Sequence, residues 1–350
     1  MLPRRIMIVG NFGRKDLFRR YFNTESKLAN GFIRAGHHVL CFSDRDHARE
    51  ANIFGTQKLG VRKMHAKLIE AAAHYRPHLV LFGHADLIEP EIYERLRDNH
   101  PGLRLAAFCV DALFRRATMQ RFAARAQHVD AAFLTSADRV QAKVLGIPAG
   151  RLFFMPNPVD PGMETARAFE APRAALRLDG QFLGTGIERR EEQIEAIRAA
   201  LPAVYRFESG GRAFATARID STTYLERLAD AAVCPNLPLD DLKPEQLAYL
   251  YSSDRIAQTL GQGVTTLTIA ASRLADLYED GVVEYTDRQD LVAKIIALYE
   301  DDAERRRVGR IGHRIAHDRT SGTRVASYIL ATSLGESEGP VSWPTMLNDA

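Results

Sequence analysis

Short apolar runs alternate with amphipathic stretches of helical spacing along most of this chain, and this rhythm most constrains its fold. The apolar runs of the first half that predict strands lie at 6–9, 39–42, 79–84, 105–111 and 131–136. Between them, residues 25–35, 64–75 and 90–99 predict helices. Because strands that alternate with helices pair in parallel with crossover helices, the first half predicts a doubly wound α/β domain.

A proline-rich stretch at 155–162 interrupts this rhythm and predicts a crossing between domains. After it, strands are predicted at 181–186, 204–207, 232–234 and 264–269, and helices at 190–201, 224–231, 254–260 and 288–314, the last with an interruption at Gly309 and Gly312. The predicted division is a first Rossmann-like domain at 1–165 and a second at 172–318. A helix at 319–334 is expected to return to the first domain, and 335–350 to form a flexible tail.

Composition narrows the class of protein. The 47 basic and 44 acidic side chains nearly cancel to a net charge of +3, which gives no support for a nucleic-acid partner. Three widely separated cysteines support neither a disulfide framework nor a zinc site, so we expect a reducing, cytoplasmic location and no metal. No segment approaches the roughly 20 apolar residues that span a bilayer.

In an open α/β sheet, ligands bind beyond the carboxyl ends of the strands. His84 and Asp111 each end a predicted strand of the first half, and Asp86 follows His84 by two residues. A histidine can orient a sugar or move a proton, and an aspartate can act as a general base toward a hydroxyl. The alternative for each is a loop residue that caps a following helix or bonds the backbone. The turn after the first strand lacks the third glycine of a dinucleotide fingerprint, so it is either a plain tight turn or a loop that lines a ligand: Gly10-Asn11-Phe12-Gly13.

In the second half, small hydroxyl side chains and a guanidinium meet at a predicted helix start. Ser252 and Ser253 precede this helix, and Arg255 lies in its first turn. Backbone N–H groups at a helix start, together with an arginine, suit phosphate oxygens. The alternative is ordinary helix capping with Arg255 in a surface ion pair.

The order of short motifs in the second half carries a family resemblance. In chain order they are Pro156-Asn157-Pro158-Val159-Asp160, Phe182-Leu183-Gly184-Thr185-Gly186 with Arg189-Arg190, the run SDRIAQTLGQGV at 253–264, Leu277-Tyr278-Glu279-Asp280-Gly281, Tyr285-Thr286-Asp287, Gly312-His313 and Arg324. The run at 253–264 resembles the Arg-x-x-Glu-x-x-(Ala/Gly)-x-Gly segment of GT-B glycosyltransferases, and the order resembles their CgeB-like spore-protein group. The resemblance covers nearly the whole second half, and the first half agrees in architecture.

This resemblance implies two Rossmann-like doubly wound domains that face a central cleft, the GT-B fold. It implies a metal-independent, retaining hexosyltransferase that needs no cofactor beyond a nucleotide-diphosphate sugar, of UDP or GDP type. The second domain would hold this donor, and the first an acceptor glycan or lipid-linked acceptor of cell-envelope polysaccharide synthesis. The residues assigned to the donor are Gly184, Gly186, Arg190, Ser252, Ser253, Arg255, Gln258 and Gly261.

Two departures from the family pattern affect the donor site. Gln258 stands where the family has a carboxylate, and the second acidic position falls at Val283 unless a short deletion places Glu284 there. A glutamine accepts and donates hydrogen bonds but carries no charge. Two alternatives therefore stay open: a catalytically degenerate GT-B protein that binds a glycan or a partner, and a GT-B-fold sugar-nucleotide epimerase.

A basic and aromatic segment at 14–22 bears on location. Arg14, Lys15, Arg19 and Arg20 interleave with Leu17, Phe18, Tyr21 and Phe22. Such a segment can rest on anionic lipid, which predicts peripheral contact with the cytoplasmic face of the membrane. The alternative is a solvated loop or helix that lines an anionic acceptor site.

Overall fold

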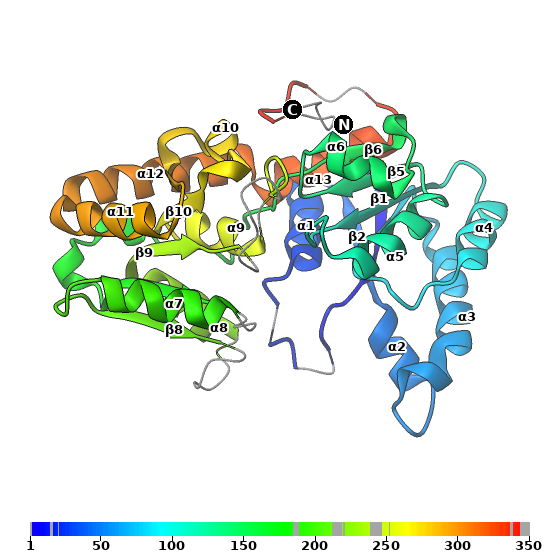
Figure 1. Cartoon of the computed structure of the whole chain (residues 1–350). Coiled ribbons are helices and arrows are strands. Elements are labelled where there is room, and N and C mark those ends of the chain that lie inside the picture. The colour runs from blue at the N-terminus through cyan, green and yellow to red at the C-terminus, as the bar shows by residue number, and fades with distance from the viewer. Residues whose placement is uncertain are drawn as a thin grey trace. The chain divides into compact units, whose positions relative to one another are not determined.

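The computed structural model describes residues 2–14, 17–19, 21–184, 189–211, 219, 221–238, 247–251, 253–336 and 339–343, with the backbone alone at Arg189. The chain divides into two compact units, Met1–Pro158 with Gly322–Ala350, and Val159–Ser321 (Figure 1). The chain therefore passes from the first unit to the second inside the proline-rich stretch.

The N-terminal unit is built on a six-stranded sheet in the order β2-β1-β3-β4-β5-β6. Its strands are β1 (Arg5–Gly10), β2 (His38–Ser43), β3 (Leu79–Phe82), β4 (Arg104–Cys109), β5 (Ala131–Leu134) and β6 (Leu152–Phe154). Every neighbouring pair is parallel, with Val9 opposite Phe82 and Cys109 opposite Leu134. The carboxyl ends of the strands thus lie at one edge of the sheet.

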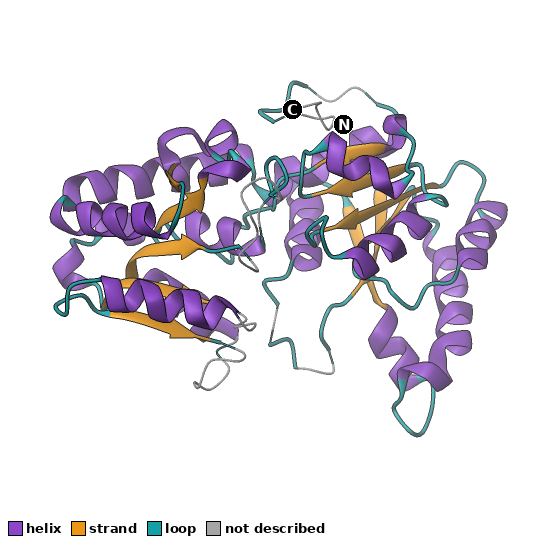
Figure 2. Ribbon diagram, viewed as in Figure 1, coloured by secondary structure: helices purple, strands orange, loops and turns teal. Residues whose placement is uncertain are grey.

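Helices cover both faces of this sheet (Figure 2). They are α1 (Thr24–Arg34), α2 (Asp44–Glu50), α3 (Gln57–Tyr75), α4 (Pro90–Asn99), α5 (Arg116–Ala126), α6 (Arg139–Ala142) and α13 (Gly322–Leu334). Asn23 begins α1, since its side-chain oxygen accepts the Ser26 N–H at 3.0 Å. The last helix, α13, packs against α1 and reaches β3 and β4.

The C-terminal unit repeats the plan with five parallel strands in the order β11-β10-β9-β7-β8. They are β7 (Leu178–Leu183), β8 (Phe207–Gly210), β9 (Ala231–Asn236), β10 (Thr265–Ile269) and β11 (Val282–Tyr285). The helices are α7 (Arg189–Ala200), α8 (Ser221–Ala229), α9 (Asp254–Gly261), α10 (Ala275–Tyr278), α11 (Arg288–Glu300) and α12 (Asp302–Arg319). Side chains of α7 and α11 share one core with β7 and β10, while α9 packs against α8 and α12. Two Rossmann-like α/β domains are confirmed.

Two predicted elements are wrong in detail. The strand predicted at 204–207 begins only at Phe207, because the Tyr205 N–H bonds the Pro202 carbonyl in a turn and Val204 is exposed. The interruption predicted at Gly309 and Gly312 does not occur, and the helix break lies at Asp301. Both glycines mark close packing: a Cβ at Gly312 would lie 2.5 Å from a backbone oxygen of the short 3₁₀ turn Glu279–Gly281, which precedes β11.

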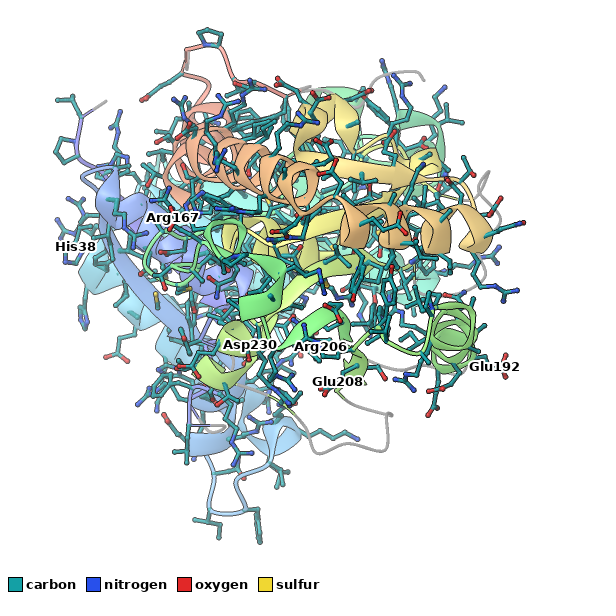
Figure 3. The ribbon with its side chains drawn as sticks, turned by 90° about the vertical axis from the view of Figure 1, so that its left-hand side faces the viewer. His38, Arg167, Glu192, Arg206, Glu208 and Asp230 are labelled. Carbon is teal, nitrogen blue, oxygen red and sulfur yellow. The ribbon has the colours of Figure 1, made fainter. Side chains whose placement is uncertain are left out.

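Charges at the amino edge of the second sheet are paired with one another. Asp179 accepts hydrogen bonds from the guanidinium of Arg206 at 3.0 Å, and Arg177 pairs with Glu208 at 3.1 Å and with Asp230 at 3.5 Å. Figure 3 shows Arg206, Glu208 and Asp230 gathered at this edge. These charges stabilise the fold and leave the opposite, carboxyl edge as the place for a ligand.

Candidate active site

His84 lies at the carboxyl edge of the first sheet between two carboxylates. Its Nδ1 is 2.9 Å from Oε1 of Glu25, and its backbone N–H donates to the same oxygen at 3.0 Å. Its Nε2 lies 3.7 Å from Oδ2 of Asp111, whose other oxygen accepts a hydrogen bond from Arg115 at 3.0 Å. The structure therefore brings together His84 and Asp111, two of the three predicted catalytic residues.

Glu25 is the member of this group that sequence reasoning missed. Its side chain is buried in the first turn of α1, directly over the ends of β1 and β3. A Cβ at Gly10 would lie 2.9 Å from the Glu25 Cγ, and one at Gly83 would lie 2.8 Å from its Oε1. The glycines at both strand ends therefore make room for the carboxylate. A glycine at the end of each strand, together with a glutamate at the start of the helix that follows β1, is the sequence signal that could have identified Glu25.

These contacts set the charge of each group. The charge of Glu25 raises the pKa of His84 well above its usual value, although burial acts against it. Burial alone would raise the pKa of Glu25, but the charge and hydrogen bonds of His84 together outweigh it and leave this pKa lowered. The imidazole of His84, 3.7 Å away, lowers the pKa of Asp111, and the guanidinium of Arg115 acts in the same direction. At neutral pH the group is thus an imidazolium held between two carboxylates, and His84 donates hydrogen bonds instead of accepting a proton.

Asp86, the third predicted catalytic residue, points to other partners. Its carboxylate accepts a hydrogen bond from Arg45 at 2.6 Å and lies 3.5 Å from Arg125. The guanidinium of Arg125 also donates to the Gly83 carbonyl. Asp86 therefore anchors the loop that follows β3, and the structure gives it no contact with His84.

The predicted acceptor-side loop is held by side chains of its own neighbourhood. The Asn11 side chain accepts the Gly13 N–H at 3.2 Å, and the Asn11 carbonyl accepts a hydrogen bond from Asn23 at 2.6 Å. Gly13 has a φ of +64°, which an L side chain rarely adopts. Gly10 faces Glu25, as described above. The loop is thus a fixed turn beside the His84 group.

At the carboxyl edge of the second sheet, Arg255 is a buried cation with neutral partners. It lies in the first turn of α9 and is 9% exposed. Its Nε donates to the Leu183 carbonyl at 2.9 Å, its Nη1 contacts Oδ1 of Asn236 at 3.3 Å, and its guanidinium lies 4.3 Å from the Phe182 ring centroid. Within the described part of the chain no carboxylate pairs with it. Because a buried charge is costly without a counter-charge, this position suits an anion.

Neighbouring residues complete this edge. Arg190 is also buried, and its guanidinium lies 5.2 Å from the same Phe182 ring. It donates to the carbonyls of Leu237 and Pro238 at 3.1 and 3.2 Å. Ser253 precedes α9, but its hydroxyl contacts Asn236 at 3.2 Å and makes no capping hydrogen bond. The helix start is therefore not capped by this side chain.

Two further hydroxyls near this edge are buried and have no hydrogen-bond partner in the part of the chain that the structure describes. They are Oγ1 of Thr268, at the end of β10, and Oη of Tyr285, at the end of β11. Burial raises the pKa of Tyr285, while the charges of Arg190 and Arg255 act against this shift. Unused hydroxyls beside two buried arginines are what a polar ligand would satisfy.

Gln258 stands at the position where the family has a carboxylate, and only its side-chain oxygen has a hydrogen-bond partner among the described residues. It is buried in α9, and its Oε1 accepts a hydrogen bond from the Tyr224 hydroxyl at 2.7 Å. Its Nε2 has no hydrogen-bond partner among the described residues. The group that Gln258 can offer a ligand is therefore a donor, where a glutamate would offer an acceptor.

The remaining predicted residues have separate roles in the structure. Gly184 makes room for Arg255, since a Cβ there would lie 2.5 Å from Nη2. The close approach at Gly261 is to Glu164, whose Cβ would lie 2.7 Å from an added methyl group, so packing within the unit accounts for that glycine. Glu284 accepts the Ala275 N–H at 3.2 Å. Gly186 and Ser252 lie outside the described residues.

Among the described residues, no three His, Cys, Asp or Glu side chains are grouped so that they could hold a metal ion. In the same part of the chain, no helix is both long enough and apolar enough to cross a membrane.

Several solved structures share this fold. Sucrose-phosphate synthase from Thermosynechococcus elongatus is similar with a TM-score of 0.60 at 14% identity, over 93% of this chain and 96% of that one. HepE from Anabaena, solved with UDP and glucose, has a TM-score of 0.56 at 12% identity, over 94% of this chain and 99% of that one. AviGT4, a glycosyltransferase of avilamycin A biosynthesis, has a TM-score of 0.56 at 13% identity, over 96% of this chain and 99% of that one. The chain therefore has the GT-B fold.

Sequence comparison adds a family match. Residues 189–331 match the model of a family described as glycosyl transferase-like. This stretch covers α7 to α13 and includes Arg190, Arg255 and Gln258. No curated protein matches the chain in sequence. The family match thus covers less than half of the chain, whereas the GT-B fold extends over both units.

Proposed function

We propose that this protein is a glycosyltransferase that transfers a sugar from a nucleoside-diphosphate sugar. The observation that carries the proposal is Arg255, a buried guanidinium at the carboxyl edge of the second sheet whose partners among the described residues are all neutral. The diphosphate of the donor would supply its missing counter-charge. The glycosyl transferase-like match covers this region, and HepE with the same fold binds UDP.

In this proposal, the C-terminal unit holds the donor. Arg255 and Arg190 neutralise the diphosphate as it leaves, which stabilises the charge that develops in the transition state without a metal ion. The start of α9 adds backbone N–H groups. Gln258 donates through Nε2 to a ribose hydroxyl while Tyr224 holds its oxygen. We propose uridine as the base of the donor nucleotide, because the HepE complex contains UDP.

The N-terminal unit would present the acceptor and the reacting side chains. His84, held as an imidazolium by Glu25, donates through Nε2 to an oxygen of the donor. Asp111, ionised at neutral pH, accepts a hydrogen bond from the acceptor hydroxyl and orients it. The lowered pKa of Asp111 makes it a weak base, so we assign positioning the larger share of its effect.

Calorimetric titration of the purified chain with UDP, GDP, CMP and ADP-glucose tests the donor site. We expect UDP to bind and Arg255→Ala to weaken binding by about 10- to 100-fold, the loss of one or two charged hydrogen bonds. Arg314→Ala is the matched control, because Arg314 is exposed on α12 in the same unit. Thermal unfolding checks that both variants fold.

Other outcomes would favour the rival functions. If no nucleotide binds to the folded wild-type protein, the chain is a non-catalytic GT-B protein, as the missing carboxylate at Gln258 would allow. Conversion of the donor sugar to an epimer without acceptor would identify an epimerase. Equal UDP affinity in Arg255→Ala and wild type would refute the role of Arg255.

The finer assignment rests on the family resemblance. We infer a retaining hexosyltransferase of the CgeB-like group that acts on a glycan or lipid-linked acceptor in cell-envelope polysaccharide synthesis, in the cytoplasm. Analysis of the anomeric configuration of the product tests the stereochemistry.

A peripheral membrane contact would bring such an enzyme to a lipid-linked acceptor. Leu17 and Phe18, in the predicted basic and aromatic segment, are 79% and 54% exposed, which supports this contact. Lys15 and Arg20 of the segment lie outside the described residues. Sedimentation with anionic vesicles tests the contact, and recovery of all protein in the supernatant would exclude it.

A further inference from the structure

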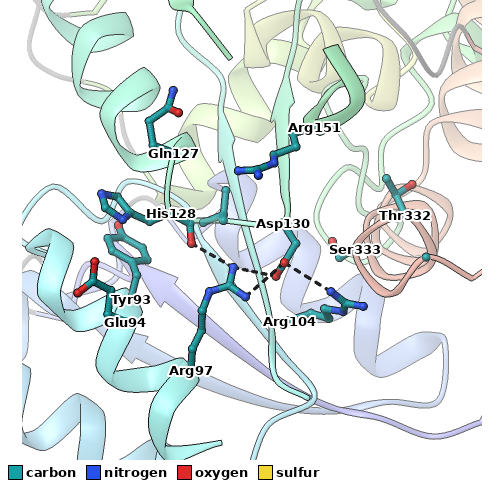
Figure 4. Close-up of a pocket in the computed structure, with 12 residues that line it drawn as sticks. Tyr93, Glu94, Arg97, Arg104, Gln127, His128, Asp130, Arg151, Thr332 and Ser333 are labelled. Atoms are coloured by element: carbon teal, nitrogen blue, oxygen red, sulfur yellow. Dashed lines mark hydrogen bonds and ion pairs between the residues drawn. The ribbon is translucent and has the colours of Figure 1, made fainter. Parts of the chain in front are cut away.

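A polar cavity of about 560 Å³ opens in the N-terminal unit, away from the His84 group (Figure 4). It lies at the amino edge of the sheet, where α4, the start of β4, the segment before β5 and the end of α13 meet. Its charged lining residues are Glu94, Arg97, Arg104, Asp130 and Arg151. Arginines outnumber carboxylates here, so the cavity favours an anion.

Asp130 forms ion pairs with two of these arginines. It lies 3.1 Å from Arg97 and 3.5 Å from Arg104, and it accepts the Leu105 N–H at 2.8 Å. Arg97 also donates to the His128 carbonyl at 3.2 Å. This network ties α4 to the amino ends of the strands, and stabilisation of the fold is enough to explain Asp130, Arg97 and one donor of Arg104.

Arg151 is not explained in this way. It ends the short 3₁₀ turn Ala149–Arg151 before β6, and its side chain has no hydrogen-bond or ion-pair partner among the described residues. Figure 4 shows its guanidinium reaching into the cavity beside Gln127, on the other side of Asp130 from Arg97. Five N–H donors in a planar fork suit an oxyanion that can accept two of them together.

The geometry points to a second ligand site in this cavity, for a small phosphate monoester whose phosphoryl group binds Arg151. The phosphate oxygens would accept hydrogen bonds from Arg151 and from the free donors of Arg104. The ester's polar body would face Gln127 and Thr332, which also line the cavity. The volume lies in the range of small-molecule sites, roughly 300–1,000 Å³.

This site is distinct from the candidate active site. Arg104 is the first residue of β4, and Asp111 follows the last residue of the same strand by two positions. At about 3.3 Å per residue, the two edges of the sheet lie roughly 17–20 Å apart. A ligand of glycerol phosphate size does not reach from one edge to the other. The proposal is therefore independent of the proposed transferase activity.

Calorimetric titration of the full-length protein with glycerol 3-phosphate, inorganic phosphate and glycerol tests the site. We expect glycerol 3-phosphate to bind, glycerol not to bind, and Arg151→Ala to weaken the binding at least about tenfold. Arg151→Lys keeps the charge without the fork and should bind with intermediate affinity. The matched control is Arg62→Ala, an exposed arginine of α3 in the same unit.

Three further measurements decide the outcome. Binding of glycerol 3-phosphate that is unchanged by saturating UDP supports a separate site, whereas competition by UDP would overturn it. An equal loss of affinity in Arg62→Ala and Arg151→Ala would show that only the overall charge matters, and this would refute the site. Retention of wild type but not of Arg151→Ala on phosphatidic acid vesicles would support the site, with a lipid headgroup as the source of the monoester.

Discussion

Replacement of Glu25 by glutamine is the sharpest test of the group around His84. The side chain keeps its shape, and its amide oxygen can still accept the backbone N–H of His84. What it loses is the negative charge 2.9 Å from Nδ1 of His84. The structure therefore predicts a lower pKa for His84 with the fold retained.

The size of this change follows from the contact. A hydrogen bond to a charged group contributes about 1.5–3 kcal/mol, and about 1.4 kcal/mol corresponds to one pKa unit. The side chain of Glu25 is 2% exposed but that of His84 is 39% exposed, so solvent screens part of the interaction. We take the lower end and expect the pKa of His84 to fall by about one unit. Asp111, at 3.7 Å, remains to hold part of the upward shift.

Nuclear magnetic resonance of the imidazole signals against pH measures this pKa directly. Glu70→Gln is the matched control, because Glu70 is exposed on α3 in the same unit and its substitution removes an equal charge. A His84 pKa that differs by less than about 0.3 units between wild type and Glu25→Gln would refute the ion pair. An equal fall in the control would show a long-range charge effect instead.

The same pair makes stability depend on pH. The raised pKa of His84 contributes stability that is fully present below its unfolded value of 6.5 and is lost as the pH rises through the folded value. The lowered pKa of Glu25 contributes stability above its unfolded value of 4.5 and loses it as the pH falls through the folded value. The stability difference between wild type and Glu25→Gln should therefore be greatest between pH 4.5 and 6.5. Urea unfolding across this range measures it, and a pH-independent difference would contradict the linkage.

Two other substitutions test separate parts of the structure. Gly31→Ala would place a Cβ 2.1 Å from the Gly322 carbonyl oxygen and push α13 away from α1. We expect the free energy of unfolding, measured in urea, to fall by about 1–3 kcal/mol. Unchanged stability would mean that the two helices do not pack this closely. Tyr224→Phe removes the hydroxyl that donates to Gln258, so UDP binding should weaken by about 3- to 10-fold in calorimetry, and equal affinity would separate Gln258 from the ligand.

The strand and helix pattern of the sequence was enough to predict two parallel-sheet domains. Buried strands such as Leu79–Phe82 are continuous apolar runs, because helices cover both faces of the sheet. Errors arose where local signals compete. Glycine weakens helices on average, yet Gly309 and Gly312 lie inside α12. A side chain at Gly312 would collide with the turn before β11, and one at Gly309 would lie within about 3 Å of Gly263 and Thr265.

The candidate site was partly predictable, because strand ends are local features of the sequence. His84 and Asp111 follow strands, and Arg255 begins a helix, so topology alone places them at carboxyl edges. Their charge states were not predictable. Glu25 lies 59 residues before His84, and nothing in the sequence between them records that the two side chains meet.

The sequence by itself determined the class of fold and the strand ends where chemistry can occur, because hydrophobic periodicity is written into each segment separately. Only the tertiary structure decided that His84 is an imidazolium, that Arg255 is buried without a carboxylate in the described part of the chain, and that Arg151 faces a cavity. Each of these depends on side chains from distant segments, whose meeting is set by how the elements pack.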